Sequence, residues 1–277
     1  MGKVFIFDSS KCTGCFNCQI ACKDEHVDND WSPIAAPQPD TGQFWIGLDE
    51  RVRGSVPKVK VSYTAKICQH CKNAPCMEAA PDAVYRRDDG LVIIDPTKAQ
   101  GRRDIVEACP YGAVFYNEAL DLPQKCTGCA HLLDDGWSVP RCVDACPHDA
   151  LRFGDEADFA DEIAKAEALL PERAETDQPQ VYYLNLPKRF VAGLVVDPEA
   201  DEVVIGAAVT LENIATGEVL ETQTDEFGDF WFDQVGACEY NLYVEADGYL
   251  VRSIYADATD EDVNIDPIDL FAEEGIE

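Results

Sequence analysis

Four cysteines near the N-terminus, Cys12, Cys15, Cys18 and Cys22, follow the spacing C-x2-C-x2-C-x3-C. Thiolates two residues apart can bind one iron–sulfur cubane, because each short loop turns its sulfur toward the same point. The fourth thiolate faces away and normally serves a second cluster, as in the bacterial ferredoxin run. Lys23 stands where a proline usually follows such a run. The spacing therefore predicts iron–sulfur ligation.

Most of the other cysteines fall into further short runs. These are Cys68-x2-Cys71-x4-Cys76, Cys109 before Pro110, Cys126-x2-Cys129, and Cys142-x3-Cys146 before Pro147. The chain has 13 cysteines, and this odd number with dense C-x2-C spacing disfavours a secreted disulfide scaffold. Zinc ribbons also use C-x2-C pairs, but the four-cysteine run favours iron–sulfur clusters over zinc.

Four positions that should carry cysteines in a four-cluster protein carry other residues. Counting back from Cys109 by the spacing of the first run leads to Ala99, Arg102 and Ile105, and Ala80 stands where the second run should end. All four vacancies belong to one cluster if the run Cys68–Cys76 and the run that ends at Cys109 are partners. Arg102 is interpreted either as a guanidinium that fills the vacated site or as an ordinary surface arginine.

The remaining twelve cysteines make three complete sites. In the crossed ferredoxin arrangement, three ligands come from one run and the fourth comes from its partner. We therefore predict three [4Fe–4S] clusters with these ligands: Cys12, Cys15, Cys18 and Cys146 for cluster 1; Cys126, Cys129, Cys142 and Cys22 for cluster 2; Cys68, Cys71, Cys76 and Cys109 for cluster 3. His26, His70, His131 and His148 lie near these runs, and we expect them to support the sites without binding iron. Cys238 is expected to be a free structural thiol, and no residue is predicted to be catalytic.

The elements that must position these runs are short. Val4–Phe7 is predicted to be a strand that leads into the first run, and residues 83–95 a β-hairpin that turns at Asp89 and Gly90. Prolines after Cys109 and Cys146 should end a helix just after each ligand. Residues 1–154 are therefore predicted to form two ferredoxin-like modules by internal duplication, with an irregular surface insertion at 24–66.

The rest of the chain has a different pattern. Apolar residues at helical spacing predict an amphipathic helix over 155–170, and prolines mark 171–188 as a linker. Residues 189–277 alternate with period two, which predicts an antiparallel β-sandwich or barrel and an α+β class overall. The predicted strands are 190–196, 208–212, 218–222, 229–232, 240–245 and 250–255. Nothing in this domain has the pattern of a catalytic site.

The formal net charge of −31 argues against nucleic-acid binding, because a phosphate binder needs a basic face. We interpret the charge as solubility in an acidic proteome, with a docking surface for a basic partner as the alternative. No signal segment and no apolar run of about 18 residues is visible, so we expect no membrane insertion and a prokaryotic, cytoplasmic location. Export together with a signal-bearing partner is the alternative.

The cysteine runs of residues 1–150, with Cys109-Pro-Tyr-Gly-Ala-Val and Lys125-Cys-Thr-x-Cys129, resemble the electron-transfer subunits of dimethyl-sulfoxide-reductase-family molybdopterin oxidoreductases. Residues 190–270 resemble carboxypeptidase-regulatory or transthyretin-like domains through 206–209, 224–230 and 247–249. The combination is similar to the small subunits of pyrogallol–phloroglucinol transhydroxylases and catechol dehydroxylases. This resemblance implies a large partner subunit that holds molybdenum on two pterin guanine dinucleotides, and an external electron donor.

The resemblance implies an electron-transfer subunit that serves reductive catechol dehydroxylation or pyrogallol hydroxyl transfer. Two alternatives stay open. A free-standing polyferredoxin would be a monomer that serves several enzymes, but the appended β domain disfavours it. A subunit of a respiratory reductase for another acceptor normally has four clusters, and the vacated site disfavours it.

Overall fold

The computed structural model describes residues 2–273, and the chain divides into two compact units. The first comprises the residues up to Glu50 together with Ser62–Leu186, and the second comprises Arg51–Val61 and the residues from Pro187 onward. Short helices and many strands make the fold α+β, as predicted. Within the described residues, no helix is both long and apolar enough to cross a membrane.

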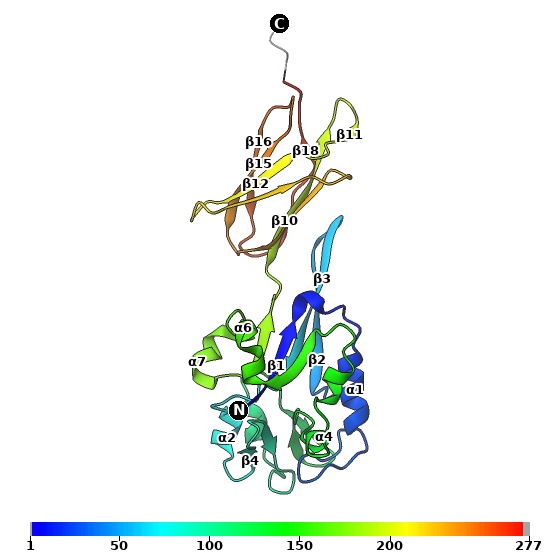
Figure 1. Ribbon diagram of the computed structural model, residues 1–277, viewed down its shortest axis with the longest axis vertical. Helices are drawn as coiled ribbons and strands as arrows, with labels where there is room; N and C mark the ends of the chain where they lie inside the picture. The colour runs from blue at the N-terminus through cyan, green and yellow to red at the C-terminus, as the bar shows by residue number, and fades with distance from the viewer. Residues whose placement is uncertain (1, 274–277) are drawn as a thin grey trace. The chain divides into compact units, whose positions relative to one another are not determined.

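A three-stranded sheet lies in the first unit (Figure 1). Its middle strand β1 (Lys3–Asp8) pairs antiparallel with β8 (Leu151–Asp155) and parallel with β9 (Val181–Leu184). Residues 4–7 of β1 are apolar and at most 2% exposed, so this strand is covered on both faces. The predicted strand at Val4–Phe7 is confirmed, and β9 joins it from a region that was predicted to be a linker.

Helices carry or flank the cysteine runs, and they pack in two pairs. The helix α1 (Asn17–His26) packs against α5 (Arg141–Asp144), and α2 (Pro75–Ala79) packs against α3 (Asp104–Glu107). A further helix, α4 (Ala130–Asp134), follows Cys129. The helices α3 and α5 both end two residues before a Cys-Pro pair, slightly earlier than the position just after each cysteine that the prolines predicted.

Two small hairpins separate the helices. In the first, β4 (Val84–Arg86) pairs with β5 (Val92–Ile94), and Gly90 in its turn has a φ of +89°, so the predicted hairpin is confirmed. In the second, β6 (Phe115–Asn117) pairs with β7 (Leu122–Gln124).

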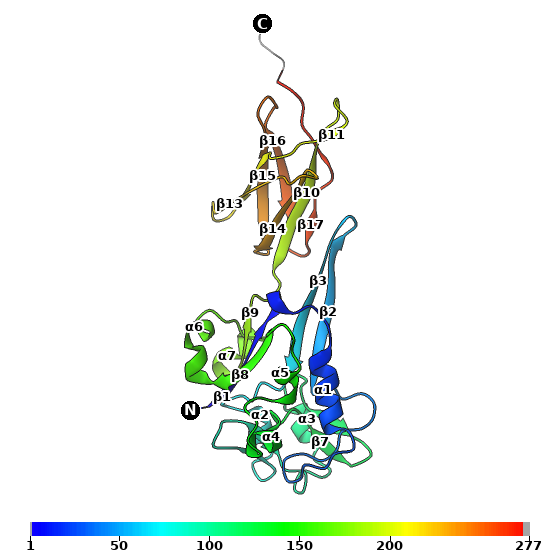
Figure 2. The same cartoon turned by 45° about the vertical axis from the view of Figure 1, so that its right-hand side comes forward.

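The insertion at 24–66 is not irregular throughout, as was expected. Its second half forms a long hairpin of β2 (Ile46–Ser55) and β3 (Lys58–Ile67) (Figure 2). Alternation of β-branched and polar residues from Lys58 onward favours this strand. Trp45, which was expected at the surface, is only 2% exposed. The hairpin tip, residues 51–61, belongs to the second unit.

The single helix predicted over 155–170 is wrong. The segment contains a 3-10 turn η2 (Glu156–Phe159) and one helical turn α6 (Ala160–Ile163), followed by η3 (Pro171–Arg173) and α7 (Ala174–Asp177). Glu167 and Tyr183 exchange backbone hydrogen bonds of 2.8 and 3.1 Å, so the backbone becomes extended at Glu167 instead of continuing as a helix. The segment to Leu186 is part of the first unit, not a linker.

The second unit contains two sheets that enclose one core. One sheet contains β10 (Arg189–Asp197), β11 (Glu202–Val203), β14 (Asp229–Val235), β17 (Val263–Asn264) and β18 (Ile268–Asp269). The other contains β12 (Ala208–Asn213), β13 (Val219–Gln223), β15 (Glu239–Glu245) and β16 (Arg252–Asp257). Val191 and Phe230 of the first sheet meet Leu211 and Leu242 of the second. The six predicted strands are confirmed, although β17 and β18 run parallel to β10.

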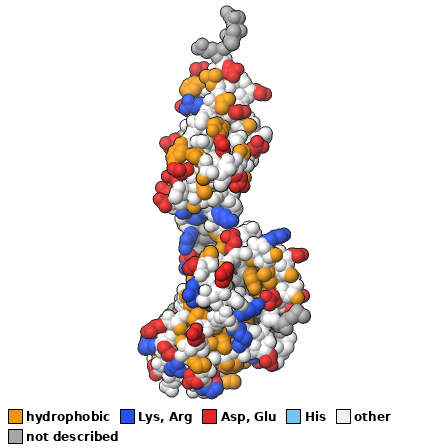
Figure 3. Space-filling model, turned by 90° about the vertical axis from the view of Figure 1, so that its left-hand side faces the viewer, with side chains coloured by type: hydrophobic (Ala, Val, Ile, Leu, Met, Phe, Trp, Pro, Cys, Tyr) orange, Lys and Arg blue, Asp and Glu red, His pale blue; other side chains and the backbone are white. Residues whose placement is uncertain are grey.

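Residues 187–277 are strongly acidic, with Lys188, Arg189 and Arg252 as their only basic residues. Figure 3 shows acidic side chains scattered among hydrophobic ones on one face of this domain. The hairpin tip adds four basic residues to the same unit: Arg51, Arg53, Lys58 and Lys60. The ammonium groups of Lys58 and Lys60 form ion pairs with Asp229 and Asp233 and lie over the ring of Trp231.

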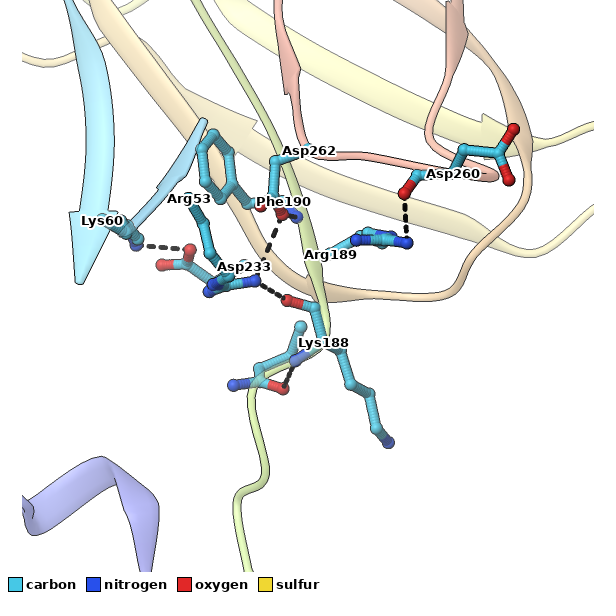
Figure 4. Close-up of polar contacts among 9 residues, drawn as sticks. Arg53, Lys60, Lys188, Arg189, Phe190, Asp233, Asp260 and Asp262 are labelled. Carbon is cyan, nitrogen blue, oxygen red and sulfur yellow. Dashed lines mark hydrogen bonds and ion pairs between the residues drawn. The ribbon is translucent and has the colours of Figure 1, made fainter. Parts of the chain in front are cut away.

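Arg53 makes the most buried of these contacts (Figure 4). Its guanidinium donates to the Lys188 carbonyl and to Asp262 Oδ1 at 3.2 Å, and it lies 5.8 Å from the centre of the Phe190 ring. The Asp262 side chain is only 4% exposed and also accepts a hydrogen bond of 2.9 Å from the Phe190 backbone N–H.

Arg53→Met is therefore expected to destabilise the β domain by about 3 kcal/mol, because it leaves a buried carboxylate without its cation. Denaturant unfolding followed by circular dichroism measures this, with Arg252→Met as the control that removes the same charge from an exposed strand position. Adding Asp262→Asn should recover part of the loss. Equal stability of Arg53→Met and Arg252→Met would contradict the prediction.

Candidate iron–sulfur sites

The first cysteine run follows the end of β1. A 3-10 turn, η1 (Ser9–Lys11), leads into a loop in which Gly14 and Phe16 have positive φ values of 68° and 58°. The helix α1 then starts at Asn17 and places Cys18 and Cys22 in the core. The loop and the first helical turn thus bring Cys12, Cys15 and Cys18 to one small pocket.

The first three cysteines of this run and Cys146 line one small, mostly apolar pocket together with Phe7, Ile46 and Leu151. Burial raises the pKa of Cys18 to about 12, and the nearby thiols of Cys12, Cys146 and Cys15 act in the same direction. Cys15 is exposed at the surface, and Cys12 and Cys146 are partly exposed. The fold thus gathers the four cysteines that the spacing assigned to cluster 1.

A second group lies deeper, where α1 packs against α5. All four of its cysteines, Cys22, Cys126, Cys129 and Cys142, are buried. Burial raises the pKa of Cys142 well above its usual value, and Cys129, Cys22 and Cys126 add to that rise. The N–H of Gly128 donates to the sulfur of Cys126 at 3.3 Å. These are the four cysteines predicted for cluster 2.

The third group lies around α2 and α3. Burial raises the pKa of Cys76 to about 11, with further contributions from Cys68 and Cys109, and the pKa of Cys71 is raised by the same three causes. Backbone N–H groups of Ala113 and Tyr111 point to Cys109. The fold thus places together the four cysteines predicted for cluster 3.

These groups have the chemistry of iron–sulfur sites. All thirteen cysteines are free thiols, and burial keeps most of the grouped ones protonated until a metal displaces the proton. Among residues 2–273, no set of three or more His, Cys, Asp or Glu side chains is close enough to hold a single metal ion. A cubane needs wider spacing, because each thiolate binds a separate iron at its own corner. The donor sets therefore fit [4Fe–4S] clusters.

The four residues that stand at the vacated ligand positions lie in two different environments. Ala80, Ala99 and Ile105 are fully buried in an apolar core next to Cys71 and Cys76. Arg102 does not enter this core. It forms ion pairs with Asp82 at 3.1 Å and Asp104 at 2.7 Å, and it donates to the Ala79 carbonyl. Of the two interpretations of Arg102, the surface arginine is the one that these contacts support.

Arg102→Ala is accordingly expected to leave the iron content and the electron paramagnetic resonance (EPR) spectrum unchanged, since its contacts are with surface acids. Ile105→Ala should instead lower the unfolding free energy by about 3 kcal/mol, because it opens a cavity in the core. Iron analysis and denaturant unfolding of both variants test these two predictions. A changed cluster spectrum in Arg102→Ala would show that the guanidinium acts on a cluster.

Three of the four histidines near the runs make hydrogen bonds to groups other than a cysteine sulfur. His26 Nδ1 lies 2.9 Å from the Cys22 carbonyl, and burial lowers its pKa to about 4. His70 Nδ1 accepts from the Val92 N–H at 3.0 Å. His131 pairs with Glu25 at 3.0 Å. His148 lies at the edge of the first pocket.

Sequence reasoning missed two residues that touch the sites. The ring of Tyr63 covers Gly14 in the first loop, and nothing in the local sequence signals this contact. Lys125 is buried beside Cys68 and Cys126, and its position immediately before a cysteine pair was the available signal. Cys238 lies apart from all three groups and packs against the core of the β domain, as expected of a free thiol.

Two family models match the chain. Residues 59–156 match a 4Fe-4S dicluster domain, and residues 191–267 match a carboxypeptidase regulatory-like domain. The first match contains all the cysteines from Cys68 to Cys146, and the second match covers most of the β domain.

Similar proteins are subunits of multi-subunit enzymes. The chain is 38% identical to the pyrogallol hydroxytransferase small subunit of Pelobacter acidigallici, over 88% of this chain and 90% of that protein. It is 32% identical to a subunit of the tetrathionate reductase of Salmonella typhimurium, over 69% and 75%. It is 35% identical to a subunit of the anaerobic dimethyl sulfoxide reductase of Escherichia coli, over 54% and 72%.

Proposed function

Because the chain is a member of the family of iron–sulfur subunits of dimethyl-sulfoxide-reductase-type molybdenum enzymes, we propose that it relays single electrons through three [4Fe–4S] clusters to or from a molybdopterin catalytic subunit. The observation that carries this proposal is the grouping of twelve cysteines into three sets of four. Electron transfer, with no catalytic role of its own, is the role that this family implies.

In this proposal each set holds one cluster, within a domain that duplicates the ferredoxin module. Cys12, Cys15, Cys18 and Cys146 hold cluster 1; Cys22, Cys126, Cys129 and Cys142 hold cluster 2; Cys68, Cys71, Cys76 and Cys109 hold cluster 3. Bound clusters supply one-electron transfer at potentials that the protein sets. Burial of the four thiols of the second set excludes water there, and backbone N–H groups such as that of Gly128 stabilise sulfur charge.

The proposed substrate of the complex is a phenolic aromatic, converted by reductive catechol dehydroxylation or by pyrogallol hydroxyl transfer. Support comes from the relative named pyrogallol hydroxytransferase small subunit, which matches this chain across both units. The large partner subunit would hold molybdenum on two pterin guanine dinucleotides, and an external donor would supply electrons. In the proposed heterodimer, the aromatic substrate binds only to the large subunit.

The names of other relatives favour one further candidate, a respiratory reductase subunit for an acceptor such as tetrathionate or dimethyl sulfoxide. In this case the chain's own part is unchanged, because the same cysteines would hold the same clusters. The two candidates therefore differ in the substrate of the catalytic subunit and in whether that substrate withdraws electrons from the complex.

Reoxidation of the native complex separates the candidates. The clusters are reduced with dithionite, excess reductant is removed anaerobically, and each acceptor is added while visible absorption is followed. Reoxidation by a catechol supports reductive dehydroxylation, whereas product formation from pyrogallol without net reoxidation supports hydroxyl transfer. Reoxidation by tetrathionate or dimethyl sulfoxide alone would overturn the phenolic proposal.

A further inference from the structure

Lys125 is a buried cation in the iron–sulfur domain. The residue is only 2% exposed, and its ammonium donates to the Val92 carbonyl and, at 3.1 Å, to the Cys126 carbonyl. The thiol of Cys68 lies beside it. Two carbonyls thus hold the ammonium in place, and burial keeps it dry.

The side chains that face the Lys125 ammonium include the thiols of Cys68, Cys76 and Cys126. Within the described residues, the hydrogen bonds of its ammonium go to carbonyls and not to a carboxylate. A buried charge without an opposite charge is strongly destabilising. The negative charge that Lys125 matches must therefore be that of the cysteine groups and of what they bind.

Lys125 lies between the third group and the second. It donates to the carbonyl of Val92, which packs in the same core as Cys71 and Cys76 of the third group. It also donates to the carbonyl of Cys126, a member of the second group. The thiols near its ammonium are those of Cys68, Cys76 and Cys109 in the third group and that of Cys126 in the second. Lys125 thus faces three thiols of the third group and one of the second.

We infer that Lys125 raises the reduction potential of the cluster held by Cys68, Cys71, Cys76 and Cys109, and raises that of the neighbouring second cluster less. This inference rests on the cluster assignment proposed above. A reduced cluster carries one more negative charge than an oxidised one. A fixed cation in a medium of low dielectric constant stabilises the reduced form. Lys125 thereby counteracts the net charge of −31, which acts in the opposite direction.

The test is an anaerobic redox titration of the native complex, followed by EPR. The signal of cluster 3 is identified as the one missing from Cys76→Ser. In Lys125→Met, the equilibrium constant for reducing this cluster should fall at least tenfold, which is a shift of about 59 mV for one electron. The shift of cluster 2 should be smaller, and iron content should be unchanged. Lys66→Met is the control. Lys66 lies two residues before Cys68 of cluster 3, but its side chain is largely exposed and pairs with Asp49.

An unshifted cluster 3, or equal shifts of all three clusters, would overturn the inference. If Lys125→Met loses the cluster, Lys125→Arg decides. Retention of the cluster with arginine supports a role for the charge, whereas loss in both variants shows that only the shape of lysine matters and overturns it. A wild-type protein without three clusters would overturn the proposed function, which distinguishes the two failures.

Discussion

Cys76→Ser is expected to remove one whole cluster and leave two. Cys76 is the buried residue of α2 and shares its group with Cys68, Cys71 and Cys109. Serine offers a harder oxygen ligand that soft iron–sulfur chemistry disfavours. Iron should fall from about twelve to about eight per chain, with four irons per cubane. Iron analysis and the EPR spectrum of the reduced protein measure the change.

Cys238→Ser is the matched control, because Cys238 is the cysteine outside the three groups. It should retain all the iron. The pairing of runs would be wrong if Cys76→Ser kept its iron, or if Cys109→Ser removed a different EPR signal from that removed by Cys76→Ser. Signals lost in common identify the members of one site.

Gly14→Ala is expected to abolish cluster 1 while the other two clusters persist. Gly14 has a φ of +68°, and a Cβ there would lie 2.1 Å from Tyr63 Cζ. Tyr63 cannot easily move away, because its ring packs edge-on against Phe16 and its carbonyl accepts from Ser9 Oγ at 2.8 Å. The loop that aims Cys12 and Cys15 must shift instead. Iron should fall to about eight per chain.

Gly112→Ala separates the steric clash from backbone strain. Gly112 follows Cys109 and has a φ of +60°, but a Cβ there would meet nothing within 4 Å. Both variants carry the strain of a left-handed residue, about 1 kcal/mol, and only Gly14→Ala also carries the clash. Gly112→Ala should therefore retain three clusters. Equal iron contents in the two variants would refute the role given to Tyr63.

Local pattern predicted much of the fold. Alternating apolar residues predicted the strands of the β domain, and Asp89-Gly90 predicted a turn that the positive φ of Gly90 explains. The prolines after Cys109 and Cys146 predicted approximately where α3 and α5 end. In each case the signal lies within a few residues of the feature that it predicts.

The failures share a different cause. The helix expected over 155–170 does not form as one element, because the backbone of Glu167 forms hydrogen bonds with that of Tyr183, sixteen positions later. The hairpin tip joins the second unit through pairs such as Arg53 with Asp262, more than two hundred residues away. Such contacts override local propensity and leave no trace in local spacing.

The candidate sites also contain some features that local sequence predicted and others that depend on distant contacts. Cysteine spacing predicted which thiols gather, because the crossing of runs is a fixed property of the ferredoxin arrangement. The spacing did not reveal the burial of Lys125 or the cover that Tyr63 provides over Gly14, since both depend on tertiary packing. That these cysteines bind clusters stays a prediction.

The central claim is that this chain is the three-cluster relay of a molybdenum enzyme. Anaerobic purification of the chain with its native partners, followed by metal analysis, tests it most directly. The account predicts about twelve irons per chain, together with molybdenum or tungsten in a large bound subunit. A lone monomer with the same iron and neither metal would contradict the account and would identify a free-standing electron carrier.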